Sequence, residues 1–368
     1  MIIKEVVMIS HLLNCKLFEN LELPAQIAHL ILPRQPREDG SLVAIAVYDL
    51  ANVIEDLGRR ALEGNKEAQF ELHAALFLIN ELEITAPTPG GHGYQFDFAF
   101  IMIRRRLEDW ADKIEQRRLP ETISDMDPDK TVNEIIRIWK AQLGASHPIF
   151  DYVEHEAGRD AVLEYLRSDY LLNIRFYDLV VYSLIGIEEE IRFEVAHNLW
   201  DEVGQGNPAN THVQLYKDML ASEGIVVDHW ELCEHLSWQG LAGYNLMMRH
   251  GLNKSRYFEA LGSLAVTELA DPYQYRKFVA GCRRVGVGTA NPAGLSYYEE
   301  HISVDVLHGQ GWLENVIRPQ VKHHPKASSL ILSGAYQRLN TALDYWDDLL
   351  QRMRRIDAAA SIARRKVS

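Results

Sequence analysis

The stretch "HISVDVLHGQGW", residues 301–312, places His301, Asp305 and His308 at spacings of four and three residues. If this stretch is helical, these spacings put both imidazoles and the carboxylate on one face. The residues between them are largely apolar, so the expected environment is a packed interior. A polar stripe of this kind predicts either a hydrogen-bonded core feature or a set of metal ligands.

Composition limits the classes of protein to consider. The chain has 368 residues, enough for two domains or one large one, and its hydrophobic fraction of 47% is that of an ordinary globular protein. The formal net charge of −14 disfavours nucleic acid as a partner, because phosphate binding needs a basic face. We therefore expect a globular protein whose partner is a small molecule.

Cysteine content and hydropathy predict the compartment. The three cysteines, Cys15, Cys233 and Cys282, lie far apart without a CxxC pair, so we expect no disulfides and a reducing cytoplasm. The N-terminal segment has no small-residue cleavage site, and no run of 18 apolar residues occurs in the chain. Neither a signal peptide nor a membrane partner is expected.

Helical periodicity dominates the whole chain. Apolar residues recur every three to four positions, and Gly and Pro mark the breaks. The predicted helices cover 42–64, 68–83, 100–118, 159–185, 188–203, 210–221, 229–249, 254–269, 271–285 and 294–315. The fold class is therefore predicted to be all-α, a helical bundle with an additional N-terminal helical region.

The pattern also predicts three parts of the chain. Residues 1–120 form an N-terminal helical region, and the polar segment 119–134 with its two prolines is the predicted linker. Residues 145–320 form the main bundle. Residues 321–368 form a C-terminal helix whose last ten residues, "AASIARRKVS", are expected to be a frayed basic tail.

Other acidic and imidazole side chains join the stripe of residues 301–308. Glu202 ends one predicted helix and His212 starts the next, with a Gly-rich turn between them that can fold both inward. Glu268 lies in the last turn of a helix otherwise built from small and apolar residues. Each of these residues taken alone has an ordinary structural explanation, such as a hydrogen-bonded core histidine or a solvent-facing acid.

The combination favours a metal centre. Three imidazoles and three carboxylates come from four predicted helices, and burying them without partners would cost several kcal/mol each. Helical bundles hold dinuclear iron or manganese with carboxylates and histidines that project inward. The absence of thiolates suits iron or manganese better than structural zinc, while catalytic zinc stays open.

These motifs resemble a known family. "NLWDEVGQG" (198–206) followed by His212, "LGSLAVTELADPYQYRKFVAGCRRVGVG" (261–288) and the HxxxDxxH element resemble the heme-oxygenase-like diiron oxidases and oxygenases, also described as iron-containing redox enzymes. The resemblance covers roughly 145–320. It implies a heme-oxygenase-like bundle without haem, holding two Fe ions (Fe2+/Fe3+) that use O2 as co-substrate. The implied ligands are Glu202, His212, Glu268, His301, Asp305 and His308.

Some members of that family add a seventh carboxylate from the helix before the NLWDE motif. The candidate here is Asp178, which lies at helical spacing among apolar residues, although a slightly rotated face would leave it merely exposed. No catalytic residue beyond the metal ligands is implied. Tyr297 or Tyr298 is a candidate for substrate contact, although aromatic residues on helical faces are mostly core.

The resemblance implies an O2-dependent oxidoreductase. Its substrate is expected to be a small amine or amino acid, oxidised by N-oxygenation or by oxidative C–C or C–H chemistry, in a homodimer. The N-terminal region would then stabilise the dimer or cover the pocket, and residues 232–250 would line the pocket. Arg175, Arg249 and Arg256 are candidates for a clamp on a substrate carboxylate.

Two alternatives remain from other classes. One is a metal-independent bundle that binds a small molecule or serves as a partner-binding adaptor. An adaptor would have no reason to keep Glu202, Glu268 and the triad His301, Asp305 and His308 together on inward faces. The other is a hydrolytic bundle, which would need a nucleophilic cysteine, and neither Cys233 nor Cys282 has an evident His partner in the sequence.

Overall fold

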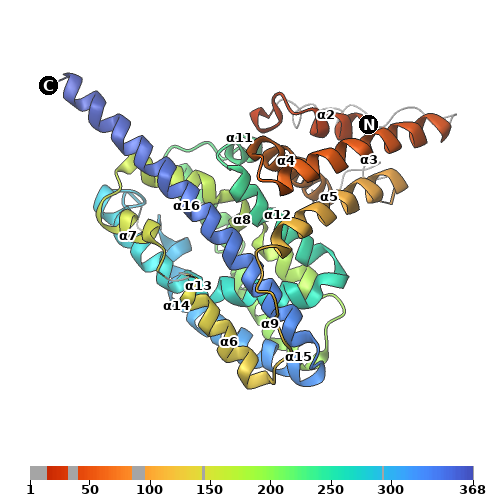
Figure 1. The fold of residues 1–368 in the computed structure, drawn as a ribbon. Coiled ribbons are helices and arrows are strands. Elements are labelled where there is room, and N and C mark those ends of the chain that lie inside the picture. Colours follow the sequence, from red (N-terminus) through yellow and green to blue (C-terminus); the bar gives the residue numbers. More distant parts are fainter. Residues whose placement is uncertain (1–14, 32–39, 85–95, 143–145, 292–293, 368) are drawn as a thin grey trace. The chain divides into compact units, whose positions relative to one another are not determined.

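The computed structural model describes residues 15–31, 40–84, 96–142, 146–291 and 294–367 (Figure 1). Within these ranges, side chains are described except at 28–31, 40–47, 271, 303–305 and 365–367. The regular structure in the described residues is entirely helical, without strands. The all-α class predicted from periodicity is therefore confirmed.

The chain divides into two compact units. The first unit comprises Met1–Arg118 with Leu236–Asn245, and the second comprises Leu119–His235 with Leu246–Ser368. The helices of the first unit are α2 (Glu22–Ile31), α3 (Gly40–Leu62), α4 (Lys66–Ile84), α5 (Phe98–Gln116) and the first half of α12 (Trp238–Leu252). The predicted N-terminal helices at 42–64, 68–83 and 100–118 correspond to α3, α4 and α5.

The second unit is the larger helical body and contains all the candidate ligands. Its α-helices are α6 (Pro128–Ala141), α7 (Pro148–His155), α8 (Arg159–Leu184), α9 (Glu189–Glu202), α10 (His212–Ser222), α11 (His229–Cys233), the rest of α12, α13 (Tyr257–Val285), α14 (Ser296–Gly311), α15 (Arg318–His323) and α16 (Ala327–Val367). A π-helical turn, Trp312–Ile317, joins α14 to α15.

In the first unit, the packing of α4 against the first half of α12 combines aromatic and polar contacts. Phe77 lies 6.2 Å from Phe18 and 5.6 Å from Tyr244 between ring centroids. Asn80 donates a 2.9 Å hydrogen bond to Oδ1 of Asn245, and both side chains are buried. Asn245 also donates a 2.8 Å hydrogen bond to the carbonyl oxygen of His73, so both of its amide atoms are partnered.

Helix α13 is central to the second unit. It packs along both α16 and α14, and α16 also contacts α8. Glycines allow α13 and α16 to approach closely: a Cβ on Gly262 would lie 1.9 Å from the carbonyl oxygen of Ile331, and one on Gly334 would lie 2.0 Å from that of Glu259. The spacing of these two helices therefore depends on the missing side chains.

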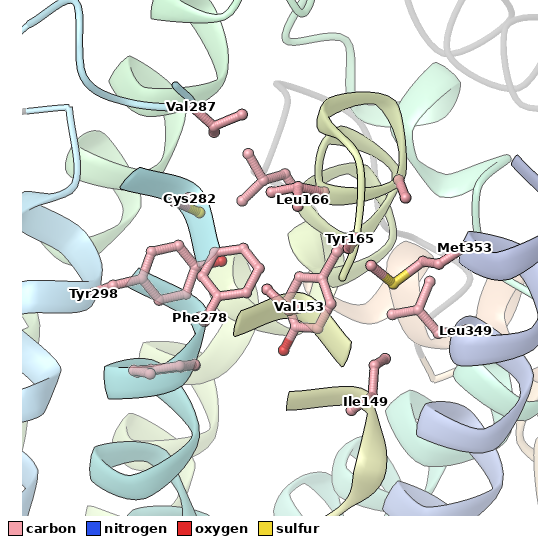
Figure 2. Packing of buried hydrophobic residues seen from close by; sticks show 14 of the residues in the cluster. Ile149, Val153, Tyr165, Leu166, Phe278, Cys282, Val287, Tyr298, Leu349 and Met353 are labelled. Carbon is pink, nitrogen blue, oxygen red and sulfur yellow. The ribbon is translucent and has the colours of Figure 1, made fainter. Parts of the chain in front are cut away.

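An aromatic core fills the space between these helices (Figure 2). Tyr165 of α8 packs 4.4 Å from Phe278 of α13, and Phe278 packs 4.5 Å from Tyr298 of α14, so the three rings form a row. Leu349 and Met353 of α16 are also buried in this cluster. Large buried rings contribute much of the hydrophobic stabilisation of such a core.

Two predicted features differ from the structure because a proline was read as a break. Residues 128–134 of the predicted linker belong to α6, where Asp127 accepts a hydrogen bond from the Lys130 amide and Pro128 begins the helix. Pro is well suited to the first helical position. The break predicted at Asp271-Pro272 is absent, since α13 continues through Pro272. Packing against α14 and α16 outweighs the one lost backbone hydrogen bond.

Three further boundaries differ from the prediction. The helix predicted at 229–249 is two helices, α11 and α12, with a break after Cys233, and the helix predicted at 294–315 passes from α14 into the π-helical turn. The C-terminal segment predicted to fray is helical to Val367 as the end of α16. In the described part of the chain, no helix combines the length and the apolarity that crossing a membrane requires.

The close approach of α13 and α16 predicts a cost for the smallest possible side chain. Gly262→Ala should lower the free energy of unfolding by about 1–3 kcal/mol, because its Cβ would collide with backbone rather than with a movable side chain. Urea denaturation measures the effect, with Gln351→Ala at an exposed position of α16 as the control. Equal stability of Gly262→Ala and the wild type would show that the helices can separate without cost.

His250 predicts a pH dependence of stability. Its ring nitrogens lie 2.9 Å from Ser263 Oγ and 3.1 Å from Gln337 Oε1. Burial, reinforced by Arg249 and Arg256, lowers the pKa of His250 well below its usual value, so the folded protein holds it neutral. The unfolded chain binds that proton near pH 6.5, so the stabilisation is present above pH 6.5 and is lost as pH falls below it.

We expect His250→Gln to reduce the loss of unfolding free energy between pH 7 and pH 5.5. One proton is worth about 1.4 kcal/mol per pH unit, which sets the largest possible change in slope. Denaturation at several pH values measures it, with the exposed His155→Gln as the matched control. An unchanged slope in His250→Gln would assign the pH dependence to other groups.

Candidate metal centre

A tight turn brings Glu202 and His212 together. Helix α9 ends at Glu202, and Gly204, Gln205 and Gly206 follow with φ values of 65°, 53° and 86°. A Cβ on Gly204 would lie 2.5 Å from the backbone of Asn210, so this turn requires glycine there. Thr211 then caps α10 at its start. As a result, His212 Nδ1 lies 3.0 Å from Glu202 Oε2.

His301 of α14 completes a buried group with these two residues. One ligand atom from each of Glu202, His212 and His301 lies within 4.8 Å of the others, and all three side chains are buried. The two imidazole rings are 4.3 Å apart between centroids. One carboxylate and two imidazoles at these separations can share a single metal ion. We call these three residues the Glu202 group.

The protonation state of His301 suits metal binding. Its Nδ1 lies 2.6 Å from the carbonyl oxygen of Tyr297 and must donate to it, which leaves the lone pair on Nε2. Burial, together with the neighbouring His212 and His308, lowers the pKa of His301 well below its usual value. The imidazole is therefore neutral and has a nitrogen available for a metal ion.

A second set of residues surrounds His308. Glu268 Oε2 lies 3.6 Å from His308 Nδ1, and both side chains are buried. Asn198 Nδ2 lies 3.0 Å from both Glu268 Oε1 and His308 Nδ1. His308 Nε2 lies 2.9 Å from Asp201 Oδ2. With a proton on Nε2 donated to Asp201, Nδ1 accepts a hydrogen bond from the Asn198 amide and lies beside Glu268. We call Glu268 and His308 the His308 pair.

Asp201 and Asn198 are residues that the sequence analysis missed. Both lie in the NLWDE motif, and Asn198, Asp201 and Glu202 share one face of α9 by their spacing of three and four residues. That shared spacing was the signal available in the sequence. Burial opposes ionisation of Asp201, but hydrogen bonds from Gln205 and His308 outweigh it and lower the pKa of Asp201. An ionised carboxylate on the far nitrogen orients a metal-binding histidine.

The remaining predicted ligands are not brought into either group by the described side chains. Asp305 lies in α14, but its side chain is outside the described residues. Asp178 Oδ2 is 3.7 Å from Arg175 Nη1, and the negative charge of Asp178 raises the pKa of the neighbouring Tyr177. Glu300, which the sequence analysis did not single out, is partly exposed and places Oε2 3.7 Å from His212 Nε2.

Tyrosines enclose the Glu202 group. Tyr297 packs 4.4 Å from His301 between ring centroids, Tyr275 packs 5.6 Å from it, and Tyr216 packs 4.8 Å from Tyr297. All are buried, as is Tyr298. The environment of the two imidazoles is thus largely aromatic, which excludes water and strengthens electrostatic interactions.

The cysteines bear on the hydrolytic alternative. All three are free and buried. Burial raises the pKa of Cys282 far above its usual value, which disfavours a thiolate. Contrary to the sequence analysis, Cys233 does have a histidine nearby, with His229 Nε2 4.0 Å from its sulfur, but its side chain has 0% exposure. Neither thiol is positioned to meet a substrate.

The residues present fit iron. Their donors are carboxylate oxygens and neutral imidazole nitrogens without thiolate, a combination suited to iron. The buried Oδ1 of Asn198 has no hydrogen-bond partner in the described structure, so the polar groups around His308 are not fully satisfied among themselves. Residues 163–342 match the iron-containing redox enzyme family. This part of the chain is therefore similar to that family.

The resemblance predicted from the motifs is therefore confirmed, and the matched range contains every predicted ligand. The chain is also 29% identical over 133 residues to nitrosourea synthase from Streptomyces achromogenes subsp. streptozoticus. That alignment covers 34% of this chain and 26% of the relative, so the chain corresponds to only about a quarter of the relative's length.

The Glu202 group predicts a metal site that can be measured without turnover. Titration of the metal-free protein with Co2+ should give the visible absorption of cobalt bound by nitrogen and oxygen ligands. His212→Ala and Glu202→Ala should weaken that site by about 10-fold or more, because each removes a ligand. The control is Glu299→Gln, because Glu299 is a partly exposed acid on the same helix as His301 and pairs with Arg283 of α13. Unchanged cobalt affinity in both ligand variants would contradict the assignment.

Proposed function

We propose that residues 163–342 form a non-haem diiron enzyme that uses O2 to oxidise a small amine or amino-acid-like substrate. The observation that carries the proposal is the buried Glu202 group, with the His308 pair on neighbouring positions of the same bundle. His301 and His308 are seven residues apart on α14, a rise of about 10 Å, and the same helix therefore contributes to both. Two sites with shared helices are the arrangement of dinuclear helical bundles.

The ligands divide between two ions in this proposal. Glu202, His212 and His301 would hold one iron, and Glu268 and His308 would hold the other. Asp305 is proposed as a further ligand from the HxxxDxxH resemblance, and Asp178 as the seventh carboxylate. When bound, the iron pair supplies the electrons and the binding positions that activate O2.

The protein's own residues set the geometry. Asp201 accepts a hydrogen bond from Nε2–H of His308 and holds that ring with Nδ1 3.6 Å from Glu268 Oε2. The carbonyl oxygen of Tyr297 accepts a hydrogen bond from Nδ1–H of His301 and orients that ring, so that Nε2 is the nitrogen available for a metal ion. Tyr216, Tyr275 and Tyr297 keep water from the Glu202 group, so an oxidising species would meet substrate rather than solvent.

Oxidation at nitrogen is favoured over C–C cleavage. The similar protein is named for making a nitrosourea, a product defined by its nitrogen chemistry. By the family resemblance, a seventh carboxylate such as Asp178 also favours N-oxygenation. The homodimer and the cytoplasmic location remain predictions of the sequence.

The decisive experiment combines iron counting with oxygen consumption. Anaerobic loading of the metal-free protein with Fe2+ should give about two irons per chain, and mixing with O2 should consume oxygen with a transient change in visible absorption. Glu268→Ala and His301→Ala should each lose about one iron and the oxygen reaction. A screen of amines and amino acids should then yield an N-oxygenated product.

Glu299→Gln again serves as the control and should keep both irons. A correctly folded wild-type protein that binds no stoichiometric iron would overturn the proposal and favour a binding bundle. Two irons without any oxygen consumption would also overturn it as an oxidase.

A further inference from the structure

The amide of Asn198 lies where the two side chains of the His308 pair meet. Asn198 is on α9, its side chain is fully buried, and it is not among the ligands proposed above. Its Nδ2 lies 3.0 Å from Glu268 Oε1 and 3.0 Å from His308 Nδ1, and Glu268 Oε2 lies 3.6 Å from the same ring nitrogen. Side chains from α9, α13 and α14 therefore direct polar atoms at one another.

These separations suit the donors of a single ion. Donor atoms at neighbouring positions around an octahedral ion, with bonds of about 2.1 Å, lie about 3 Å apart. The distances of 3.0 Å from the amide of Asn198 to Glu268 and to His308 match that spacing. The amide thus lies where a third donor to the second ion would lie.

The amide orientation of the metal-free protein is incompatible with a cation at this point. Nδ2–H is directed at Glu268 and at the lone pair of His308 Nδ1, which is the lone pair that an ion would take. Both hydrogens of an amide NH2 group carry partial positive charge, and the group acts only as a donor. An ion held by Glu268 and His308 would therefore repel Nδ2.

The other end of the amide can take the place of Nδ2. The buried Oδ1 of Asn198 has no hydrogen-bond partner in the described structure. The last torsion of an Asn side chain is soft and nearly two-fold, so a half-turn about it exchanges Oδ1 with Nδ2. The turn gives up no hydrogen bond on the side of Oδ1, and on the other side a bound ion replaces the hydrogen bonds that are lost.

We infer that Asn198 is a ligand of the second ion through Oδ1, and that its amide turns over when the ion binds. This inference rests on the proposed function, because it adds a ligand to the ion assigned to Glu268 and His308. Side-chain carbonyl oxygens are established ligands of divalent cations in proteins. Helix α9 then supplies a ligand to each ion, Glu202 to one and Asn198 to the other, as α14 does with His301 and His308.

A crystal structure of the protein loaded with Co2+ tests the inference directly. Anomalous scattering locates the ions, and an amide atom of Asn198 at about 2.1 Å from the second ion must be Oδ1, because the NH2 group offers no lone pair. An amide that keeps its hydrogen bond to Glu268 and lies more than about 3 Å from the ion would contradict the inference. Absence of cobalt from Glu268 and His308 would contradict it as well.

Cobalt titration of variants measures the same ligand in solution. Asn198→Ala should weaken binding of the second ion by about 10-fold or more, with the ion at the Glu202 group retained. Asn198→Asp keeps an oxygen donor at the same position and should bind the second ion at least as tightly as the wild type. If Asn198→Asp binds it as weakly as Asn198→Ala, or if Asn198→Ala binds it like the wild type, Asn198 is not a ligand.

Asn133→Ala, at an exposed position of α6, is the matched control and should keep both cobalt sites. These readouts need neither iron nor O2, so they fail separately from the proposed function. Two irons with oxygen consumption, both unchanged in Asn198→Ala, would sink the assignment of Asn198 alone. Cobalt bound by Oδ1 in a protein that consumes no oxygen with iron would sink the oxidase alone.

Discussion

The free-energy cost of burying ionisable side chains is the constraint on which the centre of the bundle depends. Glu202, Glu268, His212, His301 and His308 are all buried, although carboxylates lose several kcal/mol of hydration when they leave water. The protein meets part of this cost with hydrogen bonds from Asn198 to Glu268 and between Asp201 and His308. These contacts orient the buried side chains, and the buried Oδ1 of Asn198 is still left without a hydrogen-bond partner in the described structure. A purely structural polar network would gain more by satisfying every atom.

The backbone features around the centre follow from the need to bring four helices close together. Gly204 permits the turn that folds Glu202 toward His212, and Gly309 lets α14 approach the carbonyl of Glu268, where a Cβ would lie 3.3 Å from that oxygen. The aromatic row of Tyr165, Phe278 and Tyr298 packs the same helices on the side of the hydrophobic core. Close packing and ligand placement therefore depend on the same helices.

Features of the fold and of the site that follow from local periodicity could be predicted from the sequence. Features that follow from tertiary packing could not. Helices α8, α9 and α10 were predicted within one or two residues because their apolar periodicity and their turn residues agree. Pro272 misled the prediction, because the packing that keeps α13 continuous through it comes partly from α16, which is distant in sequence. The Glu202 group was predictable, since a Gly-rich turn and a helical stripe are both local patterns. Asp201 was not singled out, because its role depends on the ring orientation of a residue more than a hundred positions away.

The register of α9 against α14 explains why the NLWDE motif and the histidine stripe work as one unit. Two contacts fix it. Toward the start of α9, Glu194 accepts a 2.6 Å hydrogen bond from Asn315 in the π-helical turn and lies where a Cβ on Gly311 would be. Two turns further on, Asp201 meets His308. A shift of α9 by one residue would break both contacts and rotate Glu202 by about 100° away from His212. The π-helical turn directly after α14 places Asn315 against Glu194 and thereby fixes the position of α9, the helix that carries Glu202. Such turns are frequent beside functional sites.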